Sequence, residues 1–322
     1  MSSREQDQLT VGLAQIAPVW LQRAATIDKV VRWCAEAAGR GCGLVAFGEA
    51  LVPGYPFWIE HTDGARFESG LQKDIHAHYL DQAVQIEAGH LEPVASAARQ
   101  LGLAVVLGII ERPADRGGHS VYCSRVHIGA DGNIASVHRK LMPTYEERLS
   151  WAQGDGHGLQ VHAVGPFQVG GLNCYENWMP LARAALQAQG EDLHVALWPG
   201  NLRNTEGCTR FLAREGRSYV LSVSGLLRRS DVPPDSPAGA MLATCPEVLA
   251  NGGSCIAGPD GEWVVPPQVG AEELIVATLD HRVVRRERQN FDLAGHYARP
   301  DVVRLVVDRR RQAIACFNDA AG

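Results

Sequence analysis

The chain has 322 residues, of which 46% are hydrophobic and 20% charged, so it can bury a sizeable core in one large or two smaller domains. Its net charge of -6 is mild and no block of Lys and Arg stands out, which argues against nucleic acid or anionic membrane as a partner. The polar start and the lack of about 18 consecutive apolar residues argue against a signal peptide or membrane span, so we expect a soluble, cytoplasmic protein.

The first third of the chain alternates short apolar strands with amphipathic helices. Apolar residues from Ile27 to Ala38 recur at helical spacing and are followed by two glycines, which is typical of a helix and its end. The next strand leads directly to Glu49. The predicted elements are, in order, strand 9–16, helix 27–38, strand 44–47, a helix around 91–101 and strand 103–110. Between them, residues 59–90 form a long polar excursion of the kind that often becomes a lid or a subunit contact.

A hairpin follows, and it delivers a second charged residue. The segments 122–128 and 134–140 flank Asp131-Gly132-Asn133, a strong turn signal, and the second segment ends at Lys140. Cys174 comes next, after the apolar stretch 164–172 and shortly before a helix that begins at Pro180. A thiol at a strand-to-helix junction lies beside free backbone N–H groups, where a nucleophile can meet an oxyanion site.

After Cys174 the alternation of helices and strands resumes. The predicted elements are a helix near 181–188, strand 193–198, a helix near 209–217, strand 219–223, and a hairpin of 254–257 with 262–265. No linker rich in Pro, Gly or Ser divides the chain. We therefore expect a single α/β domain over residues 1–322, with mixed sheets whose outer faces carry helices.

The cysteines and histidines do not suggest a metal site. The eight cysteines contain no C-x-x-C pair, so a structural zinc site, a redox dithiol or a disulfide framework is not expected. His76 and His78 lie in a polar stretch without further ligands. Gly154-Asp-Gly156-His-Gly158 precedes a strand instead of a helix, which argues against a dinucleotide loop. We predict no metal and no cofactor.

Three residues at predicted strand ends have complementary chemistry. A thiol becomes a nucleophile when a base takes its proton and a nearby cation favours the thiolate. Glu49 can supply the base, and Lys140 can supply the cation and stabilise charge that develops on a substrate. A lone Cys174 would more often be a core thiol, but the three residues together predict a catalytic group.

The sequence around these residues resembles the nitrilase superfamily of carbon–nitrogen hydrolases. The resemblance runs from about residue 8 to residue 307, and its motifs are residues 47–56 around Glu49, residues 138–144 around Lys140 and residues 172–181 around Cys174. It implies a Glu49–Lys140–Cys174 triad and, from Pro-Thr-x-x-Glu-Arg, a second active-site carboxylate at Glu147. It also implies a four-layer α-β-β-α sandwich with two mixed β-sheets, and homo-oligomers built from dimers that pair through helices.

The branch of the superfamily decides the expected substrate. Glu176-Asn177-x-x-Pro180, the segment 151–156 and the segment 295–302 resemble the nitrile-hydrolysing branch. Tyr175 differs, because nitrilases most often have Trp there and amidases commonly have Tyr. The tail, about residues 311–322, is shorter than the one that helps many nitrilases to form filaments.

The resemblance implies hydrolysis of an organic nitrile to the carboxylic acid and ammonia through a covalent Cys174 thioimidate and thioester. The backbone N–H of Tyr175 is the expected oxyanion donor beside Lys140. A nitrile lacks hydrogen-bond donors, so we expect an apolar, aromatic-lined pocket. Its candidate residues are Tyr55, Trp58, Tyr175, Trp178 and Trp198. Alternatives are an aliphatic amidase, a cyanide hydratase-type enzyme that stops at the amide, and a catalytically silent binding protein.

Overall fold

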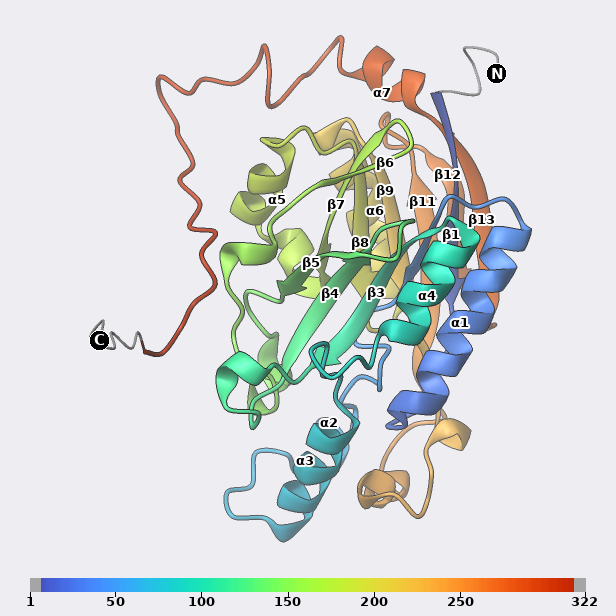
Figure 1. Ribbon diagram of the computed structural model, residues 1–322, viewed down its shortest axis with the longest axis vertical. Coiled ribbons are helices and arrows are strands. Elements are labelled where there is room, and N and C mark those ends of the chain that lie inside the picture. Colours follow the sequence, from blue (N-terminus) through green and yellow to red (C-terminus); the bar gives the residue numbers. More distant parts are fainter. Residues whose placement is uncertain (1–6, 316–322) are drawn as a thin grey trace, which may run out of the picture.

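Two mixed β-sheets lie at the centre of the molecule, and helices cover the outer face of each. The computed structural model describes residues 7–315 (Figure 1). The layers therefore run helix, sheet, sheet, helix, which confirms the predicted α-β-β-α sandwich. The fold brings the ends of strands from both sheets together, and that is what builds the site described below.

The first sheet has six strands. Its order is β13 (Glu273–Asp280), β1 (Gln8–Gln15), β2 (Leu44–Phe47), β3 (Ala104–Glu111), β4 (Tyr122–Ile128) and β5 (Ile134–Arg139). Strands β1, β2 and β3 are parallel, and β4, β5 and β13 are antiparallel to their neighbours. Strand β2 reads as a continuous apolar run because both of its faces are buried, as expected for a central parallel strand.

The second sheet has seven strands. Its order is β10 (Leu226–Arg228), β11 (Val248–Ala257), β9 (Tyr219–Ser224), β8 (Leu193–Trp198), β7 (Phe167–Asn173) and β6 (His162–Val164), and β12 (Trp263–Val269) also pairs with β11. Strands β7, β8 and β9 are parallel. Each sheet thus has a parallel centre, which fits the β-α-β rhythm of both halves of the sequence.

Helices pack on the outer faces of the sheets. The helices are α1 (Arg23–Gly39), α2 (Trp58–His61), α3 (Gly70–Gln82), α4 (Glu92–Leu101), α5 (Pro180–Gln187), α6 (Leu202–Gly216) and α7 (His281–Glu287). Helices α1 and α4 lie side by side on the first sheet, whereas α5 and α6 cover the second (Figure 1).

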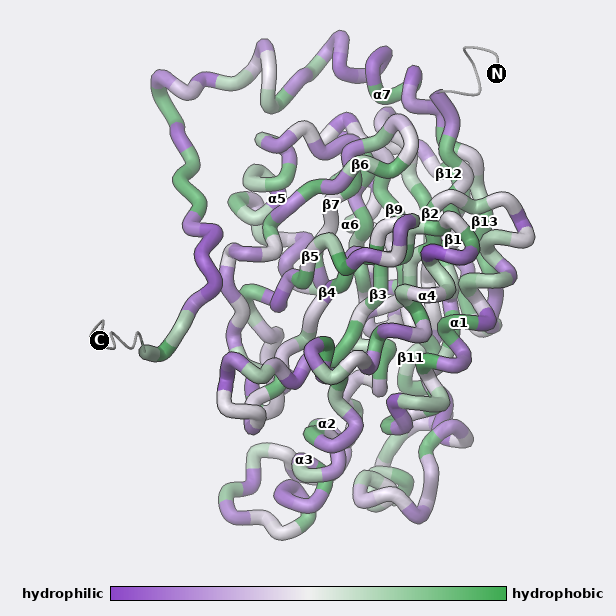
Figure 2. The backbone as a smooth tube through the Cα atoms, in the orientation of Figure 1, coloured by the Kyte–Doolittle hydropathy of each residue, from purple (hydrophilic) through white to green (hydrophobic). Residues whose placement is uncertain are grey.

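The main core lies between the two sheets. Leu13 and Leu44 from the first sheet are fully buried against the second, where Val195 and Leu221 are also fully buried. The central strands are accordingly among the most hydrophobic parts of the chain (Figure 2). Burying such side chains contributes roughly 1.5–3 kcal/mol each, so this interface supplies much of the rigidity behind the strand ends.

Three sequence expectations differ from the structure in detail. The predicted strand 164–172 is a tight hairpin of β6 and β7, because Gly165 takes a positive φ of 55° between them. The polar excursion 59–90 contains α2 and α3, which carry few of the periodic apolar residues that mark a helix. Helix α6 begins at Leu202, well before the predicted 209, and it is capped by Asn201.

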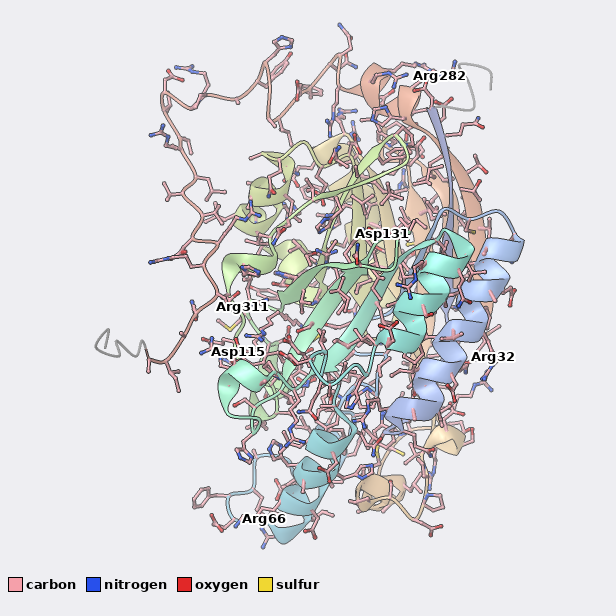
Figure 3. The ribbon with its side chains drawn as sticks, viewed as in Figure 1. Arg32, Arg66, Asp115, Asp131, Arg282 and Arg311 are labelled. Atoms are coloured by element: carbon pink, nitrogen blue, oxygen red, sulfur yellow. The ribbon has the colours of Figure 1, made fainter. Side chains whose placement is uncertain are left out.

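The segment after α7 is extended and runs along the outside of the molecule (Figure 1). It returns to the body at Arg311, whose guanidinium bonds Asp155 at 3.0 Å and the carbonyl of Val137 at 3.1 Å (Figure 3). Cys316 and most of the predicted tail 311–322 lie outside the described residues. Within residues 7–315, none of the helices is long and apolar enough to span a membrane.

Candidate active site

Glu49 stands just beyond the end of β2, with its side chain buried. Its backbone N–H donates to the carbonyl of Trp198 at the end of β8, at 3.1 Å, so the two sheets are tied together at this point. Gly108 on β3 permits the close approach, since a Cβ there would lie 2.2 Å from the carbonyl oxygen of Gly48 and 2.8 Å from the Cα of Glu49.

Lys140 follows β5 directly and is also buried. Its backbone N–H donates to the carbonyl of Cys123 at 2.8 Å. Its ammonium lies 2.8 Å from Oε1 of Glu49 and 2.7 Å from Oε2 of Glu147, and it stands 5.3 Å from the centre of the Trp151 ring. One cation thus joins two carboxylates in a buried environment, where such charge pairs persist only when mutually compensated.

Glu147 is held by three donors in all. It belongs to the short 3-10 helix Tyr145–Leu149, where it closes a capping box with Thr144. Its Oε2 accepts the ammonium of Lys140 at 2.7 Å and the N–H of Thr144 at 2.6 Å, the latter being the capping-box bond. Its Oε1 accepts the hydroxyl of Tyr55 at 2.9 Å. The carboxylate is therefore fixed in orientation.

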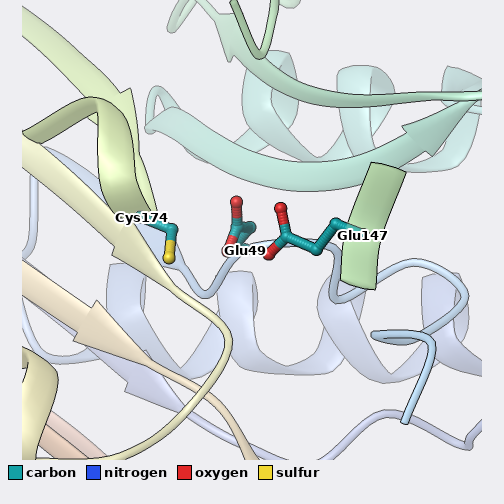
Figure 4. A group of neighbouring side chains, drawn as sticks. All are labelled: Glu49, Glu147 and Cys174. Carbon is teal, nitrogen blue, oxygen red and sulfur yellow. The ribbon is translucent and has the colours of Figure 1, made fainter. Parts of the chain in front are cut away.

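Cys174 lies where β7 passes into the 3-10 helix Cys174–Trp178. Its φ is +44°, a left-handed value that non-glycine residues rarely adopt and that often marks functional positions. The side-chain amide of Asn177 donates to the Cys174 carbonyl at 2.9 Å and so supports the turn. The sharp turn presents the thiol at the end of the strand, beside the two carboxylates (Figure 4).

Glu176 connects the segments that carry Lys140 and Cys174. Its buried carboxylate accepts the backbone N–H of Leu141 at 2.7 Å and that of Asn173 at 3.0 Å, and it pairs with Nε2 of His138 at 3.0 Å. From the sequence, Glu176 was assigned only to a motif, and its position two residues after Cys174 was the available signal of a structural role. In the structure, this carboxylate sets the distance between the lysine segment and the cysteine turn.

Burial dominates the ionisation of the site. It raises the pKa of the Cys174 thiol, while Lys140 opposes the rise, and it raises the pKa of Glu49 to about 7 against the same lysine. Burial alone would lower the pKa of Lys140, but Glu49 and the other anionic groups around it raise that pKa well above its usual range. At neutral pH the ammonium is charged, the thiol is protonated and Glu49 is poised to exchange a proton.

Three possible metal ligands lie within 4.8 Å of one another. They are one carboxylate oxygen of Glu49, one of Glu147 and the sulfur of Cys174 (Figure 4). Such a set could hold a cation in principle. Here the ammonium of Lys140 already bonds both carboxylates, so a metal ion would have to displace it. The donor set therefore fits an internal lysine cation better than a metal ion.

A cavity of about 310 Å³ opens on this group. Its wall combines Tyr55 and Phe57 with a rim of charged and amide side chains. The lining residues include Glu60, Glu146, Asn201, Arg203 and Asn204, together with Glu147 and Cys174. The described side chains include no ion-pair partner for Arg203. The cavity is thus more polar than the aromatic-lined pocket expected from the sequence.

The five aromatic residues expected around the substrate occupy different places. Tyr55 lines the cavity, with its hydroxyl 2.9 Å from Glu147 and 3.1 Å from Glu146. Trp58 is buried against Tyr79, and Trp198 is buried with its indole N–H donating to Ser222. Neither contributes to the cavity wall, because each fills a core position.

The remaining two aromatic residues, Tyr175 and Trp178, are half exposed and form an edge-on pair with ring centroids 6.4 Å apart. Trp178 lines a separate surface groove with Arg203 and Phe211. Phe57 and Arg203 were not predicted as cavity residues, because nothing in the sequence around either residue links it to Cys174.

The four-layer α-β-β-α fold thus brings a thiol, two carboxylates and a lysine ammonium together at the ends of its strands. The carbon–nitrogen hydrolase family model matches residues 10–289, and the chain belongs to this family, whose members act on carbon–nitrogen bonds. It is 38% identical over 299 residues to an aliphatic nitrilase of Sinorhizobium fredii, covering 92% of this chain and 94% of that protein.

One further relative and one solved structure are also similar to this chain. The chain is 35% identical over 314 residues to a protein named nitrilase 2 from an unknown prokaryotic organism, covering 97% of this chain and 96% of the other. Among solved structures, Nit3 of Saccharomyces cerevisiae, a member of branch 10 of the nitrilase superfamily, superposes with a TM-score of 0.68 at 17% identity, covering 90% of this chain and 97% of that one. The last comparison supports the fold.

Proposed function

We propose that this hydrolase converts an organic nitrile to the carboxylic acid and ammonia, with Cys174 as the nucleophile. The observation that carries the proposal is the buried Glu49–Lys140–Glu147 group beside the Cys174 thiol at the base of an open cavity. The nitrilase names of relatives that match nearly the whole chain support nitriles over amides as the substrate.

In the first half of the proposed reaction, the thiol proton of Cys174 passes to Glu49 as the sulfur bonds to the nitrile carbon. The nitrile nitrogen becomes anionic and takes this proton from Glu49, which gives a neutral thioimidate and leaves Glu49 as a carboxylate again. The ammonium of Lys140 faces this nitrogen, with the backbone N–H of Tyr175 as a second donor near the sulfur. Glu147 holds Lys140 in place for this step.

In the second half, Glu49 takes a proton from a water molecule whose oxygen adds to the thioimidate carbon. Glu49 passes this proton to the nitrogen, the carbon–nitrogen bond breaks, ammonia leaves and a thioester to Cys174 remains. A second water molecule adds to the thioester, again with Glu49 as base. Glu49 then passes the proton to the sulfur as the carbon–sulfur bond breaks, which releases the carboxylic acid and restores the thiol. A pKa of about 7 for Glu49 suits this alternation between acid and base.

The first test gives the purified protein matched nitriles and amides and follows ammonia, acid and amide separately. We expect acid and ammonia from nitriles, and much slower turnover of the corresponding amides. The cavity rim carries the carboxylates of Glu60 and Glu146 and the guanidinium of Arg203, which can bond a polar group on the substrate. We therefore expect a higher kcat/KM for nitriles with a polar substituent than for alkyl nitriles of equal size. Turnover confined to amides would instead favour an amidase, and amide as the sole product a hydratase.

We also propose that the enzyme assembles as a homo-oligomer built from dimers. Exposed apolar side chains gather on and beside α5 and α6, namely Trp178, Leu181 and Phe211, which are 56%, 67% and 60% exposed. Scattered apolar surface residues are ordinary, but a grouped set favours a subunit contact.

If α5 and α6 form the dimer contact, Phe211→Asp should lower the mass measured by light scattering toward that of a monomer. The reason is that the aspartate carboxylate would be buried in the interface without a partner, which disfavours association. The matched control is Leu101→Asp at the end of α4, which is 39% exposed and belongs to a helix on the outer face of the other sheet. An unchanged mass for the Phe211 variant would place the contact elsewhere.

A further inference from the structure

The two oxygens of Glu49 have different surroundings. Oε1 accepts the ammonium of Lys140 at 2.8 Å and the thiol of Cys123 at 3.4 Å. Oε2 is buried and has no hydrogen-bond partner within the described part of the chain. A buried carboxylate oxygen without a donor is costly, and its persistence at such a site points to a use in the reaction.

Cys123 contacts Glu49 but is not among the described residues that line the cavity. It is the second residue of β4, opposite Ile110 on β3, and it is fully buried. Its thiol contacts the base while its carbonyl accepts the backbone N–H of Lys140 at 2.8 Å. A single residue therefore touches both the base and the segment that carries the cation.

The thiol of Cys123 acts as a donor. Burial raises its pKa well above the usual range, and the neighbouring charge of Glu49 raises it further. It therefore remains S–H at neutral pH, and an S–H group next to a carboxylate can only donate to it. A donor to the charged form lowers the pKa of that carboxylate, in opposition to burial.

We propose that Cys123 is a positioning residue that, together with Lys140, fixes Oε1 of Glu49 so that Oε2 is the oxygen that exchanges protons with Cys174 and water. The assignment rests on the proposed function of Glu49 as the base. It accounts for two features at once: the donors gathered on one oxygen, and the lack of donors on the other.

Other titratable groups also face Glu49 and contribute to its ionisation. They are Lys140 and Glu147 from the segment after β5, Cys174 after β7, Tyr55 after β2, Tyr79 on α3 and Cys123 on β4. Among them, Lys140 and Cys123 are those that donate to the Glu49 carboxylate in the described structure. Substitution of Cys123 therefore changes one donor and leaves the ion pair in place.

Three variants of Cys123 separate the effect of the thiol donor from the effect of the side-chain volume. Cys123→Ala removes the donor and the volume, Cys123→Val removes the donor but fills the space, and Cys123→Ser keeps a donor. The acidic limb of the kcat/KM profile against pH should move upward by about half a pH unit in Ala and Val, because Glu49 loses a donor to its charged form. Cys123→Ser should stay close to the wild type.

The reaction of Cys174 with iodoacetamide gives a second readout that does not need nitrile turnover. Its rate rises as Glu49 becomes able to accept the thiol proton, so its pH dependence should shift in the same direction and by the same amount. If the protein proved inactive on nitriles, this profile would still decide the function of Cys123. The two proposals can thus fail separately.

Cys255→Ala is the matched control. Cys255 is an equally buried thiol that donates to Thr209 at 3.4 Å, away from Glu49. Its removal should leave both profiles unchanged, and thermal unfolding would confirm that all variants are folded. Wild-type profiles for the Ala and Val variants, or a shift in Cys123→Ser as large as that in Cys123→Ala, would overturn the proposal.

Discussion

Cys174→Ala is expected to abolish ammonia release from nitriles, with a loss in kcat of about 10⁴-fold or more, since removal of a covalent nucleophile leaves only binding and polarisation. Lys140 and Glu49 keep their contact in this variant, because their ion pair, 2.8 Å from Nζ to Oε1, does not involve the thiol. The loss should therefore come from chemistry and not from collapse of the site.

Intact-protein mass spectrometry after rapid acid quenching provides the check. The wild type should carry an acyl group on Cys174 during turnover, while the alanine variant should carry none. Thermal unfolding of both proteins tests whether the fold is preserved, and Cys208→Ala, a half-buried thiol on α6, is the control for loss of a cysteine. Ammonia release by Cys174→Ala at even a tenth of the wild-type rate would contradict covalent catalysis by this residue.

The fold could be predicted largely because its strands are short, apolar and placed between helical stripes. Strand β2 and the β4–β5 hairpin follow directly from a buried run and an Asp131-Gly132-Asn133 turn. Strand β13 was not predicted, although it completes the first sheet by pairing with β1 from the other end of the chain. Pairings of that kind join residues more than 250 positions apart, and no local pattern reveals them.

The candidate site was predictable where a motif marked it. Glu49, Lys140, Glu147 and Cys174 were named from three sequence segments, and the structure brings all four together. Their roles remain proposals, but their proximity is a property of the fold.

The surroundings of the site were less predictable. Trp58 and Trp198 were named as pocket residues because aromatic side chains suit a nitrile, yet each lies in a core where a large apolar ring suits equally well. Cys123 was given no role, since its contact with Glu49 depends on how β3 brings β4 near the end of β2. A residue that contacts a site residue without lining the cavity has no sequence signal of its own.

Lys140→Met is expected to lower both stability and activity, because it leaves Glu49 and Glu147 buried side by side without their shared cation. Breaking one partner out of a buried ion pair typically costs about 3–5 kcal/mol, and losing a charged donor to the developing anion costs about 10²–10³-fold in kcat. Urea unfolding and ammonia release measure the two effects.

The pH dependence of the Lys140→Met variant has a definite sign. Burial already raises the pKa of Glu49 to about 7, and Lys140 is the main influence that lowers it. Without the lysine, that pKa rises further above its unfolded value, so the folded state binds more protons than the unfolded state. Stability relative to the wild type should therefore be lost as pH rises and recovered as pH falls below about 5.

A double variant separates the structural from the chemical contribution. Lys140→Met with Glu147→Gln removes one of the two opposed carboxylates, so it should recover a large part of the stability that Lys140→Met loses. It should not recover activity, because the ammonium that faces the substrate nitrogen is still missing. If Lys140→Met were as stable as the wild type at neutral pH, or if the double variant were no more stable than the single one, the lysine would not be the cation that holds the two carboxylates together.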